Sequence, residues 1–163
     1  MKNLNLKYPF VMILVGHPLV GKTTWVKENF DKNDILLISR DEILMEVAGT
    51  MDYNLAYETV DQKLVDKELK SRLENAGKSD KNVIIDMTHM GSKRRKYNLS
   101  YFDDKFYKVA VVFPILDKSE YEVRNQERTL NENKSIPYSV VERMVSDFQS
   151  IKVEEGFNKV IVL

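Results

Sequence analysis

The feature that most constrains this chain is a glycine loop that directly follows a short apolar run. The run is Phe10–Val15, and the loop after it reads Gly16-His17-Pro18-Leu19-Val20-Gly21-Lys22-Thr23, which matches the pattern G-x-x-x-x-G-K-[ST]. The residues from Lys22 to Phe30 are compatible with a helix. A strand, this loop and a helix in that order are the setting in which the pattern forms a phosphate-binding loop, or P-loop. A chance Gly-Lys-Thr turn is the alternative, and the agreement of motif and setting argues against it.

The loop predicts a site for the phosphates of ATP or another nucleoside triphosphate, with Mg²⁺ beside them. Consecutive backbone N–H groups and a helix N-terminus present partial positive charge to a polyphosphate, and glycine lets the backbone approach without a Cβ in the way. We expect Lys22 to reach the β- and γ-phosphate oxygens and the Thr23 hydroxyl to ligate Mg²⁺. The other loop residues and Thr24 complete the expected nucleotide site, whereas Trp25 is expected to pack in the core.

Composition excludes several other classes of protein. The chain has 25 basic and 25 acidic residues and no net charge, which argues against a polybasic nucleic-acid binder but leaves a local basic groove possible. It has no cysteine and only two histidines, so thiolate catalysis and Cys-based metal sites are excluded and a histidine-rich one is disfavoured. No apolar segment approaches the length of a membrane span. We therefore expect no membrane partner and a cytoplasmic location, in the host cytoplasm if the chain is phage-encoded.

Short apolar runs alternate with longer amphipathic segments along the chain. The expected strands are Phe10–Val15, Ile35–Ser39, Asn82–Asp86, Lys108–Phe113 and Lys159–Leu163. The expected helices are Lys22–Phe30, Asp41–Val47, Leu55–Asn75, Ser92–Tyr101, Asp117–Arg128 and Pro137–Val153. Continuous apolar strands between helices indicate parallel strands that are buried on both faces. We predict one α/β domain over residues 1–163, a three-layer α-β-α sandwich with a mostly parallel five-stranded sheet. Gly77 is expected to cap a helix, and Pro137 to lie in the first turn of another.

Two carboxylates follow expected strands. Asp41 comes after Ile35–Ser39, and Asp86 ends Asn82–Asp86. Ligands bind outside the carboxyl ends of the strands in open α/β sheets, so Asp41 can accept the proton of an incoming hydroxyl, and Asp86 can lie near Mg²⁺. The alternative for Asp41 is a helix cap, and for Asp86 a cap or a turn residue. Thr88 and His89 can contact a substrate, although a structural role for His89 is favoured.

Two arginines lie on one face of an expected helix. Arg124 and Arg128 are separated by one helical turn and precede a polar flap, Thr129–Ile136. Paired guanidinium groups can stabilise the charge of a phosphoryl group during transfer. A solvated face with charge pairs is the alternative. The basic cluster Lys93–Lys96 is likewise expected to be a solvated face, unless it lines a groove for an anionic ligand.

In their order, these elements resemble the phage-type polynucleotide 5′-hydroxyl kinases, a branch of the P-loop kinases. The similar segments are GHPLVGKTTW, ISRDE, VIIDMTH and VRNQERT, the last followed by a helix that starts at a proline. The resemblance implies that Asp41 is the general base, that Arg128 is a lid arginine over the γ-phosphate with Arg124 beside it, and that Asp86 is the acidic residue after the third strand. It also implies a lid around residues 124–137 and a nucleic-acid 5′ end as substrate. The residues expected to contact the substrate are Arg40, Asp41, Asp86, Thr88 and His89.

The chain departs from that family at several positions. The family carries an arginine three residues after the base, where this chain has Leu44, and His89 stands where asparagine is usual. Leu19-Val20 replaces a Gly-Ser pair in the loop. We therefore carry two further hypotheses: a kinase that acts on another hydroxyl, in a nucleoside, a sugar or a hydroxymethylated base in DNA, and a nucleotide-binding module without transferase activity. The sequence has no N-K-x-D motif of the kind that reads guanine.

Overall fold

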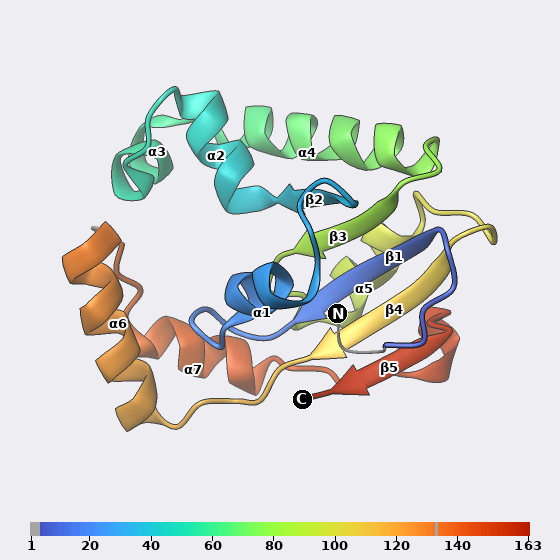
Figure 1. The fold of residues 1–163 in the computed structure, drawn as a ribbon. Coiled ribbons are helices and arrows are strands. Elements are labelled where there is room, and N and C mark those ends of the chain that lie inside the picture. Colours follow the sequence, from blue (N-terminus) through green and yellow to red (C-terminus); the bar gives the residue numbers. More distant parts are fainter. Residues whose placement is uncertain (1–3, 133) are drawn as a thin grey trace.

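The computed structural model describes residues 4–132 and 134–163, and a five-stranded parallel sheet forms its centre (Figure 1). The strands are β1 (Phe10–Val15), β2 (Ile35–Ser39), β3 (Asn82–Asp86), β4 (Tyr107–Val112) and β5 (Lys159–Val162). Their order in the sheet is β2-β3-β1-β4-β5, and all four pairings are parallel. The predicted α/β fold is confirmed.

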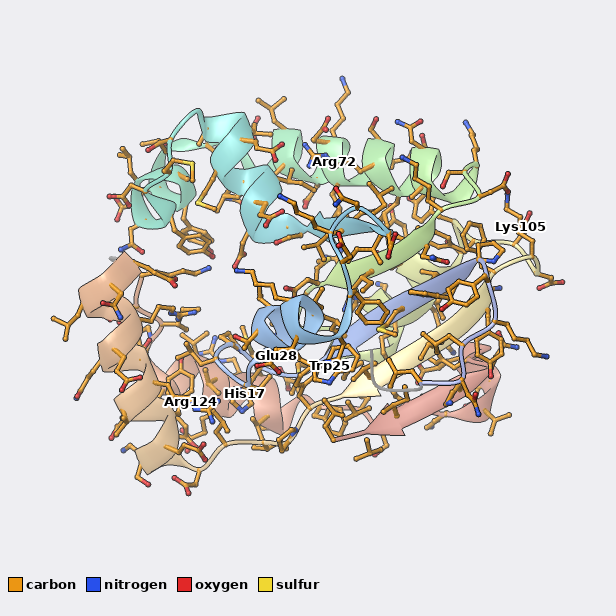
Figure 2. All side chains as sticks on the ribbon, viewed as in Figure 1. His17, Trp25, Glu28, Arg72, Lys105 and Arg124 are labelled. Carbon is orange, nitrogen blue, oxygen red and sulfur yellow. The ribbon has the colours of Figure 1, made fainter. Side chains whose placement is uncertain are left out.

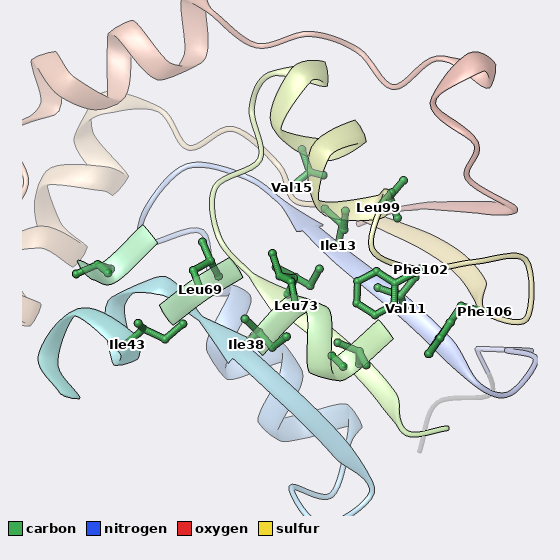
Figure 3. Packing of buried hydrophobic residues seen from close by; sticks show 14 of the residues in the cluster. Val11, Ile13, Val15, Ile38, Ile43, Leu69, Leu73, Leu99, Phe102 and Phe106 are labelled. Atoms are coloured by element: carbon green, nitrogen blue, oxygen red, sulfur yellow. The ribbon is translucent and has the colours of Figure 1, made fainter. Parts of the chain in front are cut away.

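The helices cover both faces of this sheet. They are α1 (Lys22–Asn29), α2 (Arg40–Ala48), α3 (Tyr53–Thr59), α4 (Gln62–Gly77), α5 (Ser92–Leu99), α6 (Lys118–Glu132) and α7 (Tyr138–Ser146), with the short 3₁₀ helix η1 at Val153–Glu155. Side chains of successive residues in β1 point to opposite faces. Val11, Ile13 and Val15 pack with residues of α2 to α5, as Figure 3 shows for ten labelled side chains. Phe10, Met12 and Leu14 pack with residues of α1, α6 and α7. The sheet and the helices on its two faces therefore form the three predicted layers, with one core on each side of the sheet.

One long predicted helix is two helices in the structure. The predicted helix Leu55–Asn75 is replaced by α3 and α4, with Val60 in an extended conformation between them. The Asp61 side chain accepts a hydrogen bond from the Lys63 N–H, so it caps the start of α4. Because an N-cap residue has non-helical backbone angles, the chain turns there. Amphipathic periodicity across Leu55–Asn75 concealed this break.

Three predicted helix boundaries are also wrong. Gly77 is the last residue of α4 rather than a left-handed cap, and a Cβ there would lie 1.9 Å from the Tyr101 carbonyl oxygen. Glycine is needed at this position for close packing. The helix predicted to begin at Pro137 ends at Ser146, with Pro137 as its N-cap residue. Helix α6 continues to Glu132, so the first part of the predicted flap Thr129–Ile136 is helical, and residue 133 lies outside the described residues.

Within residues 4–132 and 134–163, none of the helices is both long enough and apolar enough to cross a membrane.

Candidate functional site

The glycine loop links β1 to α1 in a conformation that only a few residue types adopt readily. Gly21 has a φ of 93° and Leu19 a φ of 69°, both in the left-handed region, which glycine occupies without strain. A Cβ on Gly16 would lie 2.9 Å from Val20 Cγ2 and 3.0 Å from Phe113 Cβ. The Gly16 N–H donates to the Thr88 carbonyl oxygen at 2.9 Å. This hydrogen bond joins the loop to the segment that follows β3. The loop therefore lies at the carboxyl ends of β1 and β3, where its N–H groups can face a phosphate.

Lys22 and Thr23 occupy the start of α1 and point toward the strand ends. Lys22 Nζ donates to the carbonyl oxygens of Gly16 and His17, both at 2.9 Å. Burial lowers the pKa of Lys22 to about 8, although the carboxylates of Asp86 and Asp41 oppose this shift. A bound triphosphate would favour the charged form of this amine and supply better acceptors than two carbonyls. The lysine is placed for a phosphate ligand.

Thr23 and Asp86 form the pair of oxygen ligands that the sequence predicts for Mg²⁺. The Thr23 hydroxyl donates to Asp86 Oδ2 at 2.8 Å. Burial raises the pKa of Asp86, and Lys22 and the hydrogen bond from Thr23 oppose the rise. No cluster of three or more His, Cys, Asp or Glu side chains could hold a metal ion among the described residues. A hydroxyl and one carboxylate fit Mg²⁺, which usually takes few protein ligands and completes its shell with phosphate oxygens and water.

Both histidines are buried and their ring nitrogens have partners. His17 Nε2 accepts from the Leu116 N–H at 3.0 Å, so Nδ1 carries the proton and donates to the Pro18 carbonyl at 2.7 Å. His89 Nδ1 donates to the Leu14 carbonyl at 2.8 Å, and its Nε2 faces Asn98 Nδ2 at 2.8 Å. Burial lowers the pKa of His17, and lowers that of His89 to about 4. The His89 residue is 2% exposed, so its ring is held as a structural group, which is the role that the sequence favours.

Asp41 lies in the first turn of α2 and does not cap it. The Ser39 hydroxyl is the cap and accepts from the Glu42 N–H at 3.4 Å. The cap alternative for Asp41 is therefore wrong. Its Oδ2 instead accepts from Lys134 Nζ at 2.5 Å. The same ammonium lies 3.5 Å from the centre of the Tyr53 ring. The Asp41 carboxylate is also within electrostatic reach of Lys22.

The two predicted arginines connect α6 with the loop and with the segment beyond the helix. Arg124 Nη1 donates to the Leu19 carbonyl at 2.9 Å, and its Nη2 pairs with Glu120 at 2.6 Å. Figure 2 labels Arg124 and His17, which lie near each other at the loop. Arg128 Nε donates to the Lys134 carbonyl at 3.2 Å. Arg128 therefore contacts the backbone of the same residue whose ammonium binds Asp41. Arg128 is also within electrostatic reach of Lys22 and Tyr53.

Other basic residues near the site have separate surroundings. Arg40 Nη2 donates to Gln62 at 2.9 Å and to Asp66 at 3.2 Å. The predicted cluster Lys93–Lys96 is not one solvated face, because Arg95 is 0% exposed and pairs with Glu155 at 2.6 Å. Trp25 packs edge-to-face on Phe113, with ring centres 5.9 Å apart, so its predicted packing role is confirmed.

Sequence reasoning missed Lys134, Tyr53 and Asn125. Asn125 Oδ1 accepts from the Ile136 N–H at 3.1 Å, and its Nδ2 donates to Ser135 at 3.2 Å, so it shapes the turn that carries Lys134. A basic residue inside a polar flap that follows the arginines was the available signal for Lys134. Tyr53 and Lys134 are far apart in the sequence, so no local sequence pattern could indicate their contact.

Comparison with known proteins places this geometry in a family and a fold. A family model described as AAA domain (AAA_33) matches residues 11–151. Similar solved structures include a chain of the Pnkp1/Rnl/Hen1 RNA repair complex, with a TM-score of 0.67, 22% identity, and coverage of 90% of this chain and 46% of that one. A chain of the PezAT toxin–antitoxin system of Streptococcus pneumoniae has a TM-score of 0.67, 16% identity, and coverage of 96% and 67%. A gluconokinase from Sinorhizobium meliloti 1021 has a TM-score of 0.55, 9% identity, and coverage of 96% and 83%.

At these identities the similarity shows a shared fold, and this chain spans about half the length of the chain from the RNA repair complex.

Proposed function

Because this chain belongs to the AAA domain family and has a P-loop kinase-like fold, we propose that it is an ATP- and Mg²⁺-dependent kinase. In this proposal it transfers the γ-phosphate of ATP to the 5′-hydroxyl of a DNA or RNA end. Residues 1–163 act as one kinase domain, with a lid around residues 124–137. The observation that carries the proposal is the position of Asp41, a carboxylate that caps no helix, contacts the Lys134 ammonium and lies within electrostatic reach of the P-loop lysine.

The residues divide into donor and acceptor roles. The backbone from Gly16 to Thr24 and the Lys22 ammonium bind the triphosphate of ATP. Asp41 takes the proton of the acceptor hydroxyl while that oxygen bonds to the γ-phosphorus, and the bond from this phosphorus to the bridging oxygen of the β-phosphate breaks, releasing ADP. Lys22 and Arg128 stabilise the charge on the transferring group, and Arg124 supports Arg128 from the same helix.

Thr23 and Asp86 are the side chains that would hold Mg²⁺. Their 2.8 Å contact and the burial of Asp86 suit a hard cation with oxygen ligands. When bound, Mg²⁺ supplies charge neutralisation for the β- and γ-phosphate oxygens.

A nucleic-acid end is the first choice of acceptor because of the ordered motifs and the RNA repair complex among the similar structures. Arg40 and Thr88 lie on the acceptor side, next to Asp41 and after β3. The buried state of Leu44, 0% exposed, favours a second candidate. Because the side chain three residues after the base lies in the core, the site can also suit another hydroxyl, in a nucleoside, a sugar or a hydroxymethylated base in DNA.

Transfer of label from ATP tests the proposal directly. Incubation of the protein with γ-labelled ATP, Mg²⁺ and a panel of 5′-hydroxyl oligonucleotides, nucleosides and sugars should place label on the oligonucleotides. A Lys22→Ala variant is the control and should transfer none. Label on a nucleoside or sugar alone would select the second candidate. Tight ATP binding with no labelled acceptor would instead identify a nucleotide-binding module without transferase activity.

A further inference from the structure

The side chain of His17 is fully buried, although it belongs to the loop that is expected to face a ligand. The P-loop pattern leaves its position open to any residue, so the motif does not explain why a histidine stands here. The ring reaches far along the chain, because the Leu116 N–H donates to its Nε2 at 3.0 Å across 99 positions of sequence. A backbone N–H can only donate, so Nε2 is the unprotonated nitrogen of a neutral ring.

This hydrogen bond lies next to the start of the lid helix. Leu116 belongs to residues 113–117, the segment that joins β4 to α6. The residue after it is Asp117, whose Oδ1 accepts from the Glu120 N–H at 2.9 Å. A carboxylate that accepts from the third N–H of a helix is an N-cap, so Asp117 caps α6. The bond to His17 therefore holds the residue that directly precedes this cap.

The first turns of α6 also contact the P-loop through their side chains. Within Lys118–Glu132, Tyr121 is the residue that is buried, and its ring lies edge-on to the His17 ring with the centres 5.9 Å apart. Arg124 donates to the Leu19 carbonyl at 2.9 Å and lies near His17 (Figure 2). The lid helix therefore contacts the P-loop at its beginning, and His17 takes part in two of these contacts.

Packing alone does not fix the distance between the loop and the segment before α6. An apolar cavity of about 230 Å³ lies between them, and its wall includes Gly16 and His17 from the loop and Phe113 and Ile115 from the segment. Side chains beside a cavity lack packing partners on that side. The hydrogen bond from the Leu116 N–H to the imidazole is thus a constraint that the surrounding apolar groups do not supply.

His17 contacts the donor lysine through its backbone and the lid through its ring. Its carbonyl oxygen accepts from Lys22 Nζ at 2.9 Å, whereas its Nε2 accepts from the Leu116 N–H. The helix that begins after this contact carries Arg128, the candidate lid arginine. A side-chain substitution leaves the carbonyl group in place, so it can release α6 while the lysine keeps its contact.

We propose, on the basis of the kinase function above, that His17 is a positioning residue for the lid. By accepting the Leu116 N–H, its ring holds α6 where Arg128 can contact the transferring phosphate. The ring itself touches neither the nucleotide nor the acceptor. Because the motif allows any residue at this position, the link between the loop and α6 is a property of this chain rather than of P-loops in general.

Two substitutions separate the hydrogen bond from the ring. His17→Gln keeps an acceptor oxygen near the place of Nε2 but has no ring, whereas His17→Phe keeps a ring against Tyr121 but has no acceptor. A misplacement of about 1 Å can cost about 100-fold in rate, so His17→Phe should lower kcat by about 10- to 100-fold and His17→Gln should keep at least about a third of it. Calorimetry should give an ATP Kd within about threefold of the wild type for both, because the backbone of the loop binds the phosphates.

The position of α6 can be measured without any transfer of phosphate. The chain has no cysteine, so Met51→Cys and Leu130→Cys provide two sites for spin labels, at residues that are 88% and 86% exposed. Leu130 lies on α6, and Met51 lies just before α3. With ADP and Mg²⁺ added, the distribution of label distances should be the same with His17 and with His17→Gln. It should shift or broaden with His17→Phe.

Separate outcomes would overturn the inference and the proposed function. An unchanged distance distribution in His17→Phe would overturn the inference, as would a His17→Gln variant that behaves like His17→Phe. Equal losses of ATP affinity and kcat would mean that His17 only supports the loop. Absence of label on every acceptor would reject the kinase function, and the distances would still decide whether His17 positions α6. If thermal melting shows that His17→Phe does not fold, His17→Asn replaces it, because asparagine is too short to reach Leu116.

Discussion

The two walls of the candidate site differ in how their polar groups are held. The P-loop wall consists of the loop Gly16–Thr23 and the segment after β3. Several of its groups are buried and bonded: the Gly16 N–H to Thr88, the His89 ring to Leu14, and Arg95 to the carbonyls of His89 and Met90 at 2.9 and 3.1 Å. Buried groups that are bonded in this way are held in position. This wall is organised before any ligand arrives.

The lid wall consists of the start of α2, Tyr53, and the segment from Arg124 to Ile136. Its contacts include two ion pairs that are at least partly exposed: the Lys134 and Asp41 side chains are 13% and 52% exposed, and those of Arg124 and Glu120 are 39% and 48% exposed. Pairs of this kind contribute little to stability and exchange easily. The comparison teaches that the P-loop wall is held in one arrangement, whereas the contacts of the lid wall are of a kind that a bound ligand can replace.

The largest expected effect comes from the carboxylate of the lid wall. Asp41→Asn keeps the shape of the side chain but cannot take a proton from the hydroxyl, so we expect transfer to fall by about 10²- to 10⁴-fold, the range for loss of a general base. Calorimetry should show ATP affinity within a few-fold of the wild type, because the P-loop wall is untouched. Turnover at the wild-type rate with a genuine acceptor would remove Asp41 from the mechanism.

A smaller loss is expected from the lid arginine. Arg128→Ala should lower kcat by on the order of a hundredfold, by analogy with arginines that stabilise transferring phosphoryl groups. Single-turnover measurements separate this effect from ATP binding. Arg143→Ala is a control, because Arg143 is an exposed arginine on α7 that has no predicted role in the site. A loss of less than threefold in Arg128→Ala would reduce Arg128 to a surface charge.

Lys134 tests whether the lid contacts are exchangeable. If its ammonium leaves Asp41 for the phosphates when ATP binds, Lys134→Ala should lower kcat by roughly tenfold, the value of one modest charge contact. Because the pair is partly exposed, the free energy of unfolding should change by less than about 1 kcal/mol. A rate above that of the wild type would mean that Lys134 only blocks the base. A large fall in stability would contradict the view of the lid wall given above.

The P-loop wall was much easier to predict from the sequence than the lid wall. The strands Phe10–Val15, Ile35–Ser39 and Asn82–Asp86 have the predicted bounds, because each contains a continuous apolar run that ends at polar residues. The loop motif follows one of them directly. Local sequence therefore encodes both the scaffold and the phosphate site.

The contacts that the sequence did not reveal are formed between distant residues. Lys134 reaches Asp41 across 93 positions of sequence, and Arg95 reaches Glu155 across 60. Arg95 lies in a basic run that has the pattern of a solvated face, and only the return of the chain through η1 supplies its carboxylate. Local periodicity cannot report such pairings, since they depend on how separate elements approach in three dimensions.

The smallest expected effect concerns the rigidity of the P-loop wall and its dependence on pH. Burial lowers the pKa of His89 to about 4 from its ordinary value of 6.5, so between these values the unfolded chain binds more protons than the folded one. Stability must therefore fall as the pH decreases through this range, by about 1 kcal/mol between pH 6.5 and 5.5. His89→Asn keeps a donor for the Leu14 carbonyl and cannot titrate, so urea unfolding of this variant should show a shallower pH dependence by that amount. The pH contribution of His17 is common to both proteins and cancels in the difference. Equal slopes for the two proteins would mean that His89 becomes protonated without opening the wall, and that the P-loop wall is as adaptable as the lid.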